Sequence, residues 1–285
     1  MVGQSGARLF DASAGDGLAP VVTVVTICRD AATTIEATML SVLGQTYGDL
    51  EYIIVDGASI DSTVEIVERI STAFPDRIVT VVSEPDQGIS DAMNKGVERS
   101  EGDLVVHLHA GDRFTGTDVI EKVVDSYRRI GWRWAVATSI AVDDHGVQQR
   151  VYEPHADFRT LLRKNVIPHQ STFLVRDVFT KHGLFRVDLP QGMDYEFWMR
   201  IAFRGAERYE VLPLTTTYYL VGGASSRIGE LLWHVARIRR ELRRDGVRLS
   251  RASDARFLGR IALFWTWNEA RDRCRQLGRR SRPSL

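Results

Sequence analysis

Apolar, β-branched runs alternate with helical patterns through the first 112 residues, and this alternation limits the fold more than any other feature. Strands are predicted at 21–27, 52–55, 78–82 and 104–108, with helical patterns at about 35–43, 64–70 and 90–97. A helix that connects two strands of one sheet leaves those strands parallel. The pattern therefore predicts an α/β fold with a mostly parallel central sheet flanked by helices.

An aspartate follows each of the last three predicted strands. Asp56, Asp86 and Asp112 stand just beyond the strand ends, each in a turn-rich segment. Because ligands of open parallel sheets bind at the carboxyl ends of the strands, we expect the three carboxylates to converge on one site. Each aspartate taken alone is equally typical of a helix cap or a turn.

Neither common phosphate-binding loop occurs in this sequence. A strand-to-helix Gly-x-Gly-x-x-Gly and a Gly-x-x-x-x-Gly-Lys-Ser/Thr are both missing. A nucleotide would instead need carboxylates and a cation to hold it. The sequence thus argues against dehydrogenases and P-loop enzymes.

The composition is that of a soluble globular protein. The 285 residues are 44% hydrophobic and 26% charged, and no apolar run is long enough to cross a bilayer. We interpret residues 1–20 as a flexible leader, because a basic start followed by an apolar stretch is missing. Cys28 and Cys274 are far apart, which favours a reduced, cytoplasmic protein and excludes a disulfide framework.

The zero net charge conceals a basic C-terminal region. Sixteen arginines lie beyond Gly222, against few acidic residues, so the first two-thirds of the chain is net acidic. Residues 228–285 are predicted to form basic amphipathic helices, with one apolar face at Leu231, Leu232, Val235, Ile238 and Leu242 and another around Phe257, Ile261, Phe264 and Trp265. Such helices either contact an anionic membrane, here the inner face of the plasma membrane, or pack against the catalytic domain.

Several blocks, in this order and spacing, resemble family-2 inverting glycosyltransferases of the bacterial surface-polysaccharide and glycolipid branch. The resemblance spans about residues 21–227. It rests on the blocks 26–30, 34–47, 51–61, 83–96, Pro168-His169-Gln170, Asp194-Tyr195-Glu196-Phe197 and Gly222-Gly223-Ala224-Ser225-Ser226.

The resemblance implies a GT-A fold with a nucleotide-binding half at about 21–115 and an acceptor half at about 116–227. It implies that Asp56 binds the base of a nucleoside-diphosphate sugar, UDP-sugars being favoured, and that Asp86 lies near the same nucleoside. Asp112 falls on the last acid of the family's Asp-x-Asp motif, which meets the metal. Asp194 falls on the general base.

The chemistry of sugar transfer calls for the same residue types. A divalent cation, Mg²⁺ or Mn²⁺, can neutralise the charge that grows on a diphosphate leaving group, and Mg²⁺ needs few protein carboxylates. A carboxylate opposite the leaving group can take the proton of an attacking hydroxyl. One displacement with one base inverts the anomeric configuration. The hydroxyl acceptor would be a glycan, a glycolipid or a small molecule.

Further positions are predicted to line the same site. On the donor side these are Thr26, Cys28, Arg29, Gln87, Lys95, His109, Ala110, Gly111 and Arg227; on the acceptor side they are His169, Gln170, Tyr195 and Glu196. The metal segment departs from the family pattern, because Ala110 replaces the first acid of the motif and His109 the usual Asn. Lys95 is equally expected as a solvated helix lysine, His109 as a buried structural histidine, and Asp194 as a helix cap.

Two other functions remain open. A non-catalytic nucleotide-sugar or glycan-binding protein is compatible with the altered metal segment, although binding alone does not need Asp194. A sugar-1-phosphate nucleotidylyltransferase would need a Gly-rich loop with basic residues after the first strand, and Cys28-Arg29-Asp30-Ala31-Ala32 offers none. Nucleic-acid binding is not expected, because the acids at the strand ends would repel a phosphate backbone.

Overall fold

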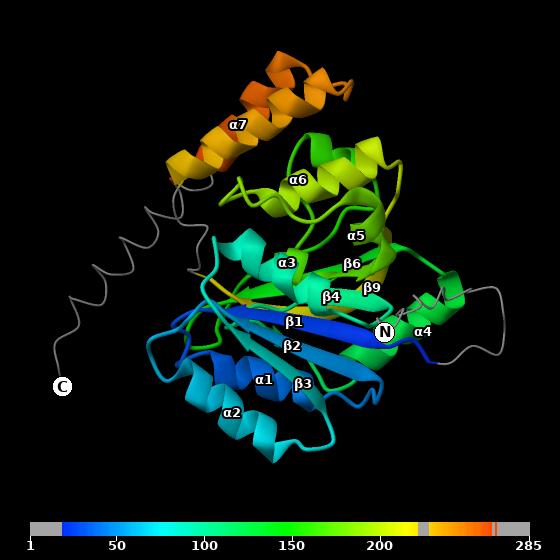
Figure 1. Cartoon of the computed structure of the whole chain (residues 1–285). Helices are drawn as coiled ribbons and strands as arrows, with labels where there is room; N and C mark the ends of the chain where they lie inside the picture. Colours follow the sequence, from blue (N-terminus) through cyan, green and yellow to red (C-terminus); the bar gives the residue numbers. More distant parts are fainter. Residues whose placement is uncertain (1–18, 222–227, 264–265, 267–285) are drawn as a thin grey trace, which may run out of the picture.

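The computed structural model describes residues 19–221, 228–263 and 266 (Figure 1). Several predictions fall outside these residues. They concern most of the leader, Gly222 to Arg227, Phe264, Trp265 and the segment 267–285 with Cys274.

One nine-stranded sheet forms the centre of the molecule. Its strand order is β3-β2-β1-β4-β8-β6-β9-β5, and β7 pairs with β6. The strands are β1 (Val22–Cys28), β2 (Leu50–Asp56), β3 (Ile78–Ser83), β4 (Leu104–His107), β5 (Arg113–Phe114), β6 (Trp134–Val142), β7 (Gln148–Tyr152), β8 (Thr172–Val175) and β9 (Glu210–Leu220). The β3-β2-β1-β4 half is parallel, as the alternation predicts, whereas β8 runs antiparallel to β4 and the far half is mixed. The predicted α/β class is confirmed.

Helices cover both faces of the sheet, because successive side chains of a strand point to opposite faces. Successive residues of β1 belong to different cores: Val24 packs with α1 (Ile35–Leu43) and α2 (Thr63–Ala73), and Val25 packs with α3 (Ile89–Arg99). Figure 1 shows α1 and α2 below the sheet and α3 above it. The helix α4 (Val119–Ile130) joins the lower layer.

The upper layer also holds the helical elements between β7 and β9. They are the 3₁₀ turns η1 (Phe158–Leu162) and η2 (His169–Ser171), α5 (Asp177–His182) and α6 (Met193–Met199), which continues as the π-helical turn Arg200–Arg204. The helix predicted after Asp194 exists. It begins earlier, with Gly192 as N-cap at φ +75°, so Asp194 lies inside the first turn and does not cap the helix.

The helix α7 (Ile228–Arg244) lies across α6, at the top of Figure 1. Its predicted apolar face is buried at Val235, Ile238 and Leu242, with Leu231 packed against the same core. Residues 251–263 form a second helix, which buries Phe257. The C-terminal helices therefore pack against the rest of the chain through these faces. Among the described residues, no helix combines the length and the apolar character that crossing a membrane requires.

Candidate functional site

Asp56 ends β2 with its carboxylate buried and surrounded by uncharged donors. Only 1% of the residue is exposed. One carboxylate oxygen accepts hydrogen bonds from the Ser59 amide at 3.0 Å and the Ser83 hydroxyl at 2.7 Å, and the other accepts from the Ser59 hydroxyl. The Cys28 thiol lies 3.7 Å from that second oxygen. Hydroxyl and amide donors therefore fix this carboxylate at the carboxyl edge of the sheet.

Asp86 approaches the same edge through a gap left by glycine. A Cβ on Gly57 would collide with Asp86 Oδ2 and come within 3.4 Å of the Arg29 side chain. Asp86 also accepts a 2.8 Å hydrogen bond from the Gly88 amide at the start of α3. The absence of a side chain at Gly57 thus brings Asp86 and Arg29 beside the end of β2.

The other donor-side predictions lie around these two aspartates. Thr26 is buried and donates to the Leu108 carbonyl at 2.7 Å, and burial raises the pKa of the Cys28 thiol to about 12. Arg29 is exposed at the end of β1. The Gln87 side chain is exposed as well.

Lys95 is held within the turn that carries Asp86. Its ammonium lies 3.0 Å from Glu84 and 3.4 Å from Asp91, and it donates to the Pro85 carbonyl at 2.8 Å. These contacts raise the pKa of Lys95, with the Glu84 hydrogen bond as the largest cause. Because these contacts engage the ammonium within the turn, we assign Lys95 a structural role and not a contact with the donor.

The segment 109–112 continues alongside β1 beyond the end of β4. The Ala110 amide donates to the Ile27 carbonyl at 3.1 Å, and Gly111 has φ +102°, where a Cβ would lie 3.2 Å from Leu220. The turn delivers Asp112 to a buried position, 6% exposed, where it accepts a 3.3 Å hydrogen bond from the Leu220 amide. Burial raises the pKa of Asp112 to about 7.

The charge of Asp112 fits a cation that brings most of its own ligands. Within the part of the chain that the structure describes, no group of three or more His, Cys, Asp or Glu side chains could hold a metal ion. Asp112 is nevertheless a buried carboxylate whose ionised form is disfavoured by desolvation. Mg²⁺ commonly binds through one or two carboxylates plus phosphates and water, so this single ligand suits a cation carried by a diphosphate.

Two histidines connect the strand ends with the C-terminal half. The rings of His109 and His169 lie 4.6 Å apart between centroids. The Nε2 atoms of both rings are buried without a hydrogen-bond partner among the described residues. Burial lowers the pKa of both rings, so they are neutral at pH 7. Buried polar atoms are rarely left unpaired, so the pair offers two nitrogens to a ligand or to water.

Asp194 approaches this histidine pair from α6. Burial is the larger effect and lowers the pKa of His169, whereas the charge of Asp194 raises it. Asn165 donates to Asp194 Oδ2 at 3.4 Å. Asn165 belongs to no motif, and its partner is 29 residues away, so no sequence pattern points to this contact.

The other three residues predicted on the acceptor side make contacts within the protein. Gln170 donates to the Ser139 hydroxyl at 3.0 Å and is 4% exposed. Glu196 pairs with Arg200 at 2.9 Å. Tyr195 accepts a 2.9 Å hydrogen bond from Arg239 of α7. Since all three side chains are engaged in packing or pairing, we do not include them among the acceptor contacts proposed below.

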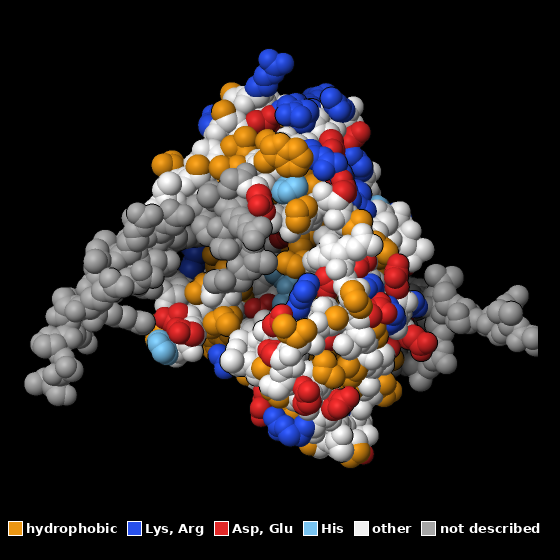
Figure 2. All heavy atoms as spheres, turned by 60° about the vertical axis from the view of Figure 1, so that its left-hand side comes forward, with side chains coloured by type: hydrophobic (Ala, Val, Ile, Leu, Met, Phe, Trp, Pro, Cys, Tyr) orange, Lys and Arg blue, Asp and Glu red, His pale blue; other side chains and the backbone are white. Residues whose placement is uncertain are grey.

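Figure 2 shows the face that carries the strand ends. Histidine and acidic side chains lie in a hollow between the sheet half and the upper helices. The sequence-predicted Asp56, Asp86 and Asp112 thus come from the strand edge and Asp194 from the upper layer, and His109 of the strand edge contacts His169 of η2.

Comparisons with known proteins agree with this architecture. The chain is 33% identical to a glycosyltransferase of Mycobacterium tuberculosis over 190 residues, 65% of this chain and 70% of that protein. It is 26% identical to the PGL/p-HBAD biosynthesis glycosyltransferase of Mycobacterium bovis over 224 residues, 74% of this chain and 81% of that protein.

Solved structures show the same fold. Staphylococcus aureus TarS 1-349 in complex with UDP-GlcNAc matches with a TM-score of 0.63 and 17% identity, over 85% of this chain and 71% of that one. The mannosyltransferase PcManGT of Pyrobaculum calidifontis, in complex with GDP-Man and Mn²⁺, matches with a TM-score of 0.62 and 20% identity, over 96% of this chain and 78% of that one.

The sequence model described as "Glycosyl transferase family 2" matches residues 23–189, which is more than half of the chain. Together with the relatives, this match shows that the chain belongs to glycosyl transferase family 2 and has the GT-A fold.

Proposed function

We propose that this glycosyltransferase moves a hexose-type sugar from a nucleoside-diphosphate donor to a hydroxyl acceptor, with inversion at the anomeric carbon. The observation that carries the proposal is the pair of buried carboxylates at the strand ends. Asp56 and Asp112 lie there without a basic partner among the described residues. The charge of Asp194, on α6, acts on His169, whose ring lies 4.6 Å from that of His109 in the metal segment.

On the donor side, Asp56 and Asp86 receive the nucleoside. The hydrogen bonds from Ser59 and Ser83 fix the orientation of the Asp56 carboxylate, so its oxygens can accept from the N–H of a base. Arg29 and Asp86 stand next to it across Gly57. We favour a UDP-sugar. One structural neighbour was solved with UDP-GlcNAc and another with GDP-Man, so both bases belong in the test.

Asp112 holds the divalent cation, Mg²⁺ or Mn²⁺. When bound, the cation neutralises the charge that the diphosphate gains as it leaves. A neighbour with the same fold was solved with Mn²⁺ and its nucleotide sugar. The burial that raises the pKa of Asp112 also excludes water, which strengthens the attraction between the carboxylate and a cation.

Asp194 takes the proton from the acceptor hydroxyl. Asn165 orients its carboxylate, and the neutral His169 stands beside it without adding a positive charge. Removing the proton on the side opposite the leaving group makes the hydroxyl a better nucleophile in a single displacement. A glycan, glycolipid or small-molecule hydroxyl is the acceptor.

The first experiment measures binding and turnover of UDP-, GDP- and dTDP-sugars with Mn²⁺, Mg²⁺ or EDTA. We expect one donor to bind in a metal-dependent way, and Asp112→Asn to lose that binding. Asp194→Asn should retain donor binding and lose about a thousandfold in kcat. Asp49→Asn, at an exposed position, is the control.

Two results would contradict the proposal. Full turnover in Asp194→Asn would remove the base assignment. Donor binding without turnover for any acceptor in the native chain would favour the alternative, a nucleotide-sugar or glycan-binding protein.

The outer face of the C-terminal helices is the proposed contact with an anionic membrane. Six exposed arginines lie on α7, on the helix 251–263 or between them: Arg240, Arg244, Arg248, Arg251, Arg256 and Arg260. Trp233, 61% exposed, shares the α7 stripe of Arg240 and Arg244, opposite the buried Ile238. Lys and Arg side chains gather over this region at the top of Figure 2. Basic residues beside an exposed Trp suit a lipid interface.

Vesicle flotation tests this contact. The protein should float with vesicles that contain phosphatidylglycerol and not with vesicles of phosphatidylcholine alone, and high salt should weaken the binding. Arg240→Glu with Arg244→Glu should abolish flotation. The pair Arg128→Glu and Arg129→Glu, exposed on α4, should not. Equal flotation of all variants would overturn the assignment.

A further inference from the structure

Arg239 is a fully buried charge at the centre of the C-terminal contact. None of its surface is exposed. Its Nε donates to Asp254 at 2.8 Å, its Nη2 to the Ser253 hydroxyl at 3.1 Å, and its Nη1 to the Leu162 carbonyl at 3.0 Å and the Tyr195 hydroxyl at 2.9 Å. Its guanidinium also lies 4.5 Å from the centre of the Phe257 ring. These contacts use four of the five N–H groups of the guanidinium.

Two of these partners lead directly to the proposed base. Tyr195 is the neighbour of Asp194 in the first turn of α6, and its hydroxyl also donates to the Leu161 carbonyl at 3.2 Å. Leu162 ends η1, three residues before Asn165, which donates to Asp194. One guanidinium therefore ties together the two segments that form the Asn165–Asp194 contact.

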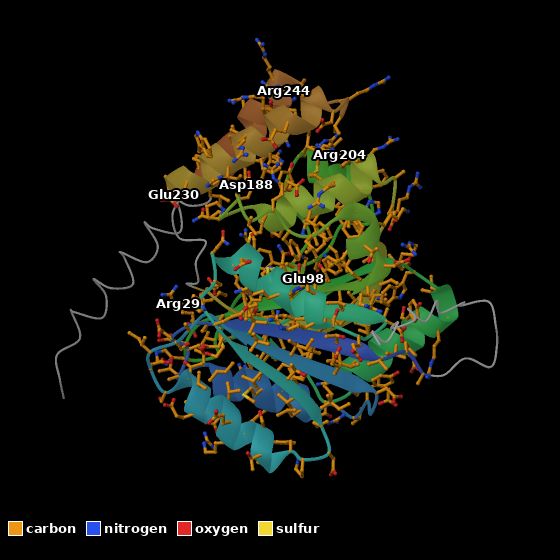
Figure 3. All side chains as sticks on the ribbon, in the orientation of Figure 1. Arg29, Glu98, Asp188, Arg204, Glu230 and Arg244 are labelled. Atoms are coloured by element: carbon orange, nitrogen blue, oxygen red, sulfur yellow. The ribbon has the colours of Figure 1, made fainter. Side chains whose placement is uncertain are left out.

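The rest of α7 supports the same end of α6. Gly192, the N-cap, lies under α7, where a Cβ would come within 3.5 Å of Ile238. Before it in the chain, Asp188 pairs with Arg237 of α7 at 2.6 Å. Figure 3 shows Asp188 directly beneath α7, far from Arg29 at the strand ends. The helix α7 thus contacts the chain on both sides of Asp194 in sequence.

We propose that Arg239 is a positioning residue for sugar transfer, which sets the orientation of Asp194 through Tyr195 and Leu162. The inference rests on the proposed role of Asp194 as the base. It makes the C-terminal helices part of the reacting half of the enzyme. A buried arginine is costly to retain, and well-packed apolar residues often stabilise a protein as well, so a geometric role accounts for its presence. The fork of the guanidinium fixes several acceptors at once, which a lysine cannot do.

The main test is Tyr195→Phe, which removes only the hydroxyl that links Arg239 to α6. The ring and its 5.2 Å contact with Phe257 remain. We expect kcat to fall about tenfold, because small displacements of a reacting group have effects of that order or larger. The Kd for the donor, which binds at the strand ends, should be unchanged.

A double-mutant cycle separates positioning from stability. If Tyr195 acts only through Asp194, Tyr195→Phe should have no further effect on kcat once Asp194→Asn has removed the base. A merely structural role would give the same tenfold loss in both backgrounds. Arg239→Lys should reproduce the kcat loss of Tyr195→Phe.

Arg243→Lys is the matched control on the same helix. Arg243 pairs with the same Asp254 but contacts neither Tyr195 nor Leu162 in the described structure. It should retain native kcat. Thermal unfolding of every variant confirms that the folded protein is being compared.

The outcomes distinguish the two proposals. Full activity in Asp194→Asn would remove the base itself. Loss of activity in Asp194→Asn, together with an unchanged kcat or additive losses for Tyr195→Phe, would overturn the positioning role and leave the proposed function standing.

Discussion

The strand ends and the upper helical layer treat their carboxylates in opposite ways. At the strand ends, Asp56 is surrounded by hydroxyl, amide and thiol donors, and Asp112 accepts from a backbone amide. In the upper layer, Asp194 apart, four carboxylates lie against guanidinium groups: Asp188 against Arg186 and Arg237, Glu196 against Arg200, Glu241 against Arg186 and Arg237, and Asp254 against Arg239.

The pKa shifts follow this difference. Burial raises the pKa of Asp112 to about 7, whereas the hydrogen bond from Arg186 is the main cause that holds the pKa of Asp188 well below its usual range. A carboxylate that is already neutralised serves packing. One that is buried without a cation is costly until a ligand supplies the opposite charge. The comparison therefore separates the proposed site from the supporting structure.

The largest effect should come from breaking a buried pair. Glu196→Gln leaves Arg200, 13% exposed on its side chain, without its charged partner. We expect unfolding to become easier by about 4 kcal/mol, which is a fall in Tm of about 10 °C. Donor binding by the folded protein should not change. Glu36→Gln, which removes an exposed partner of Arg69, should cost less than about 1 kcal/mol. Equal losses in the two variants would contradict the distinction.

The second prediction is a gain in stability: Asp112→Asn should become more stable than the native chain as the pH rises. Because the pKa of Asp112 rises from 3.8 to about 7 on folding, the folded state binds a proton more tightly, and stability falls as pH rises through this range. Between pH 5 and 8 the native chain should lose about 2.7 kcal/mol relative to Asp112→Asn. Thermal unfolding of both chains without divalent cation measures the difference. A constant difference in Tm across this pH range would show that Asp112 stays ionised.

The third prediction concerns the affinity for the donor, in a variant that keeps both Asp112 and Asp194. In Gly57→Ala, the new methyl group would collide with Asp86 Oδ2 and displace this carboxylate from the end of β2. We expect donor affinity to fall about tenfold, or about 1.4 kcal/mol, with little change in Tm. Calorimetric titration with the nucleoside diphosphate measures it. Gly48→Ala has open space for its Cβ and should bind normally. Normal binding by Gly57→Ala would remove Asp86 from the donor site.

The smallest effect belongs to a partly exposed pair. Asp188 is 49% exposed on its side chain, so Asp188→Asn should cost only about 0.5 kcal/mol at neutral pH. Folding lowers the pKa of Asp188. Its contribution to stability is therefore present above pH 3.8 and is lost as the pH falls through the pKa of the folded state. Native and variant Tm values should therefore converge in acid. A gap that widens in acid would assign the effect to something other than the charge.

The sequence determined the parallel half of the sheet and the location of its acids. Continuous apolar runs predicted β1, β2 and β4 within one or two residues, because strands buried on both faces need such residues throughout. The placement of Asp56 at the end of one strand and of Asp112 beyond the end of another followed from local order alone. The C-terminal apolar face at Val235, Ile238 and Leu242 was also readable, because helical spacing repeats regularly.

The sequence left the neighbours of each side chain undetermined. Lys95 and Glu196 fitted the predicted site by position, yet both pair with nearby charges. The division of the catalytic domain at about residue 115 stays a prediction. Asn165 and Arg239 carry no motif; Asn165 contacts the proposed base across 29 residues, and Arg239 contacts its neighbour Tyr195 across 44.

The alternation of apolar runs and helices, and the acids that follow the strands, were thus fixed by the chain itself, because burial and strand direction act locally. Only the tertiary structure decided which carboxylates meet a guanidinium and which remain without one. Charge pairing depends on atoms a few ångströms apart. Some pairs are local in the chain, such as Glu196–Arg200, but the Arg186–Glu241 and Arg237–Asp188 pairs join residues 55 and 49 positions apart, which only the docking of α7 brings together.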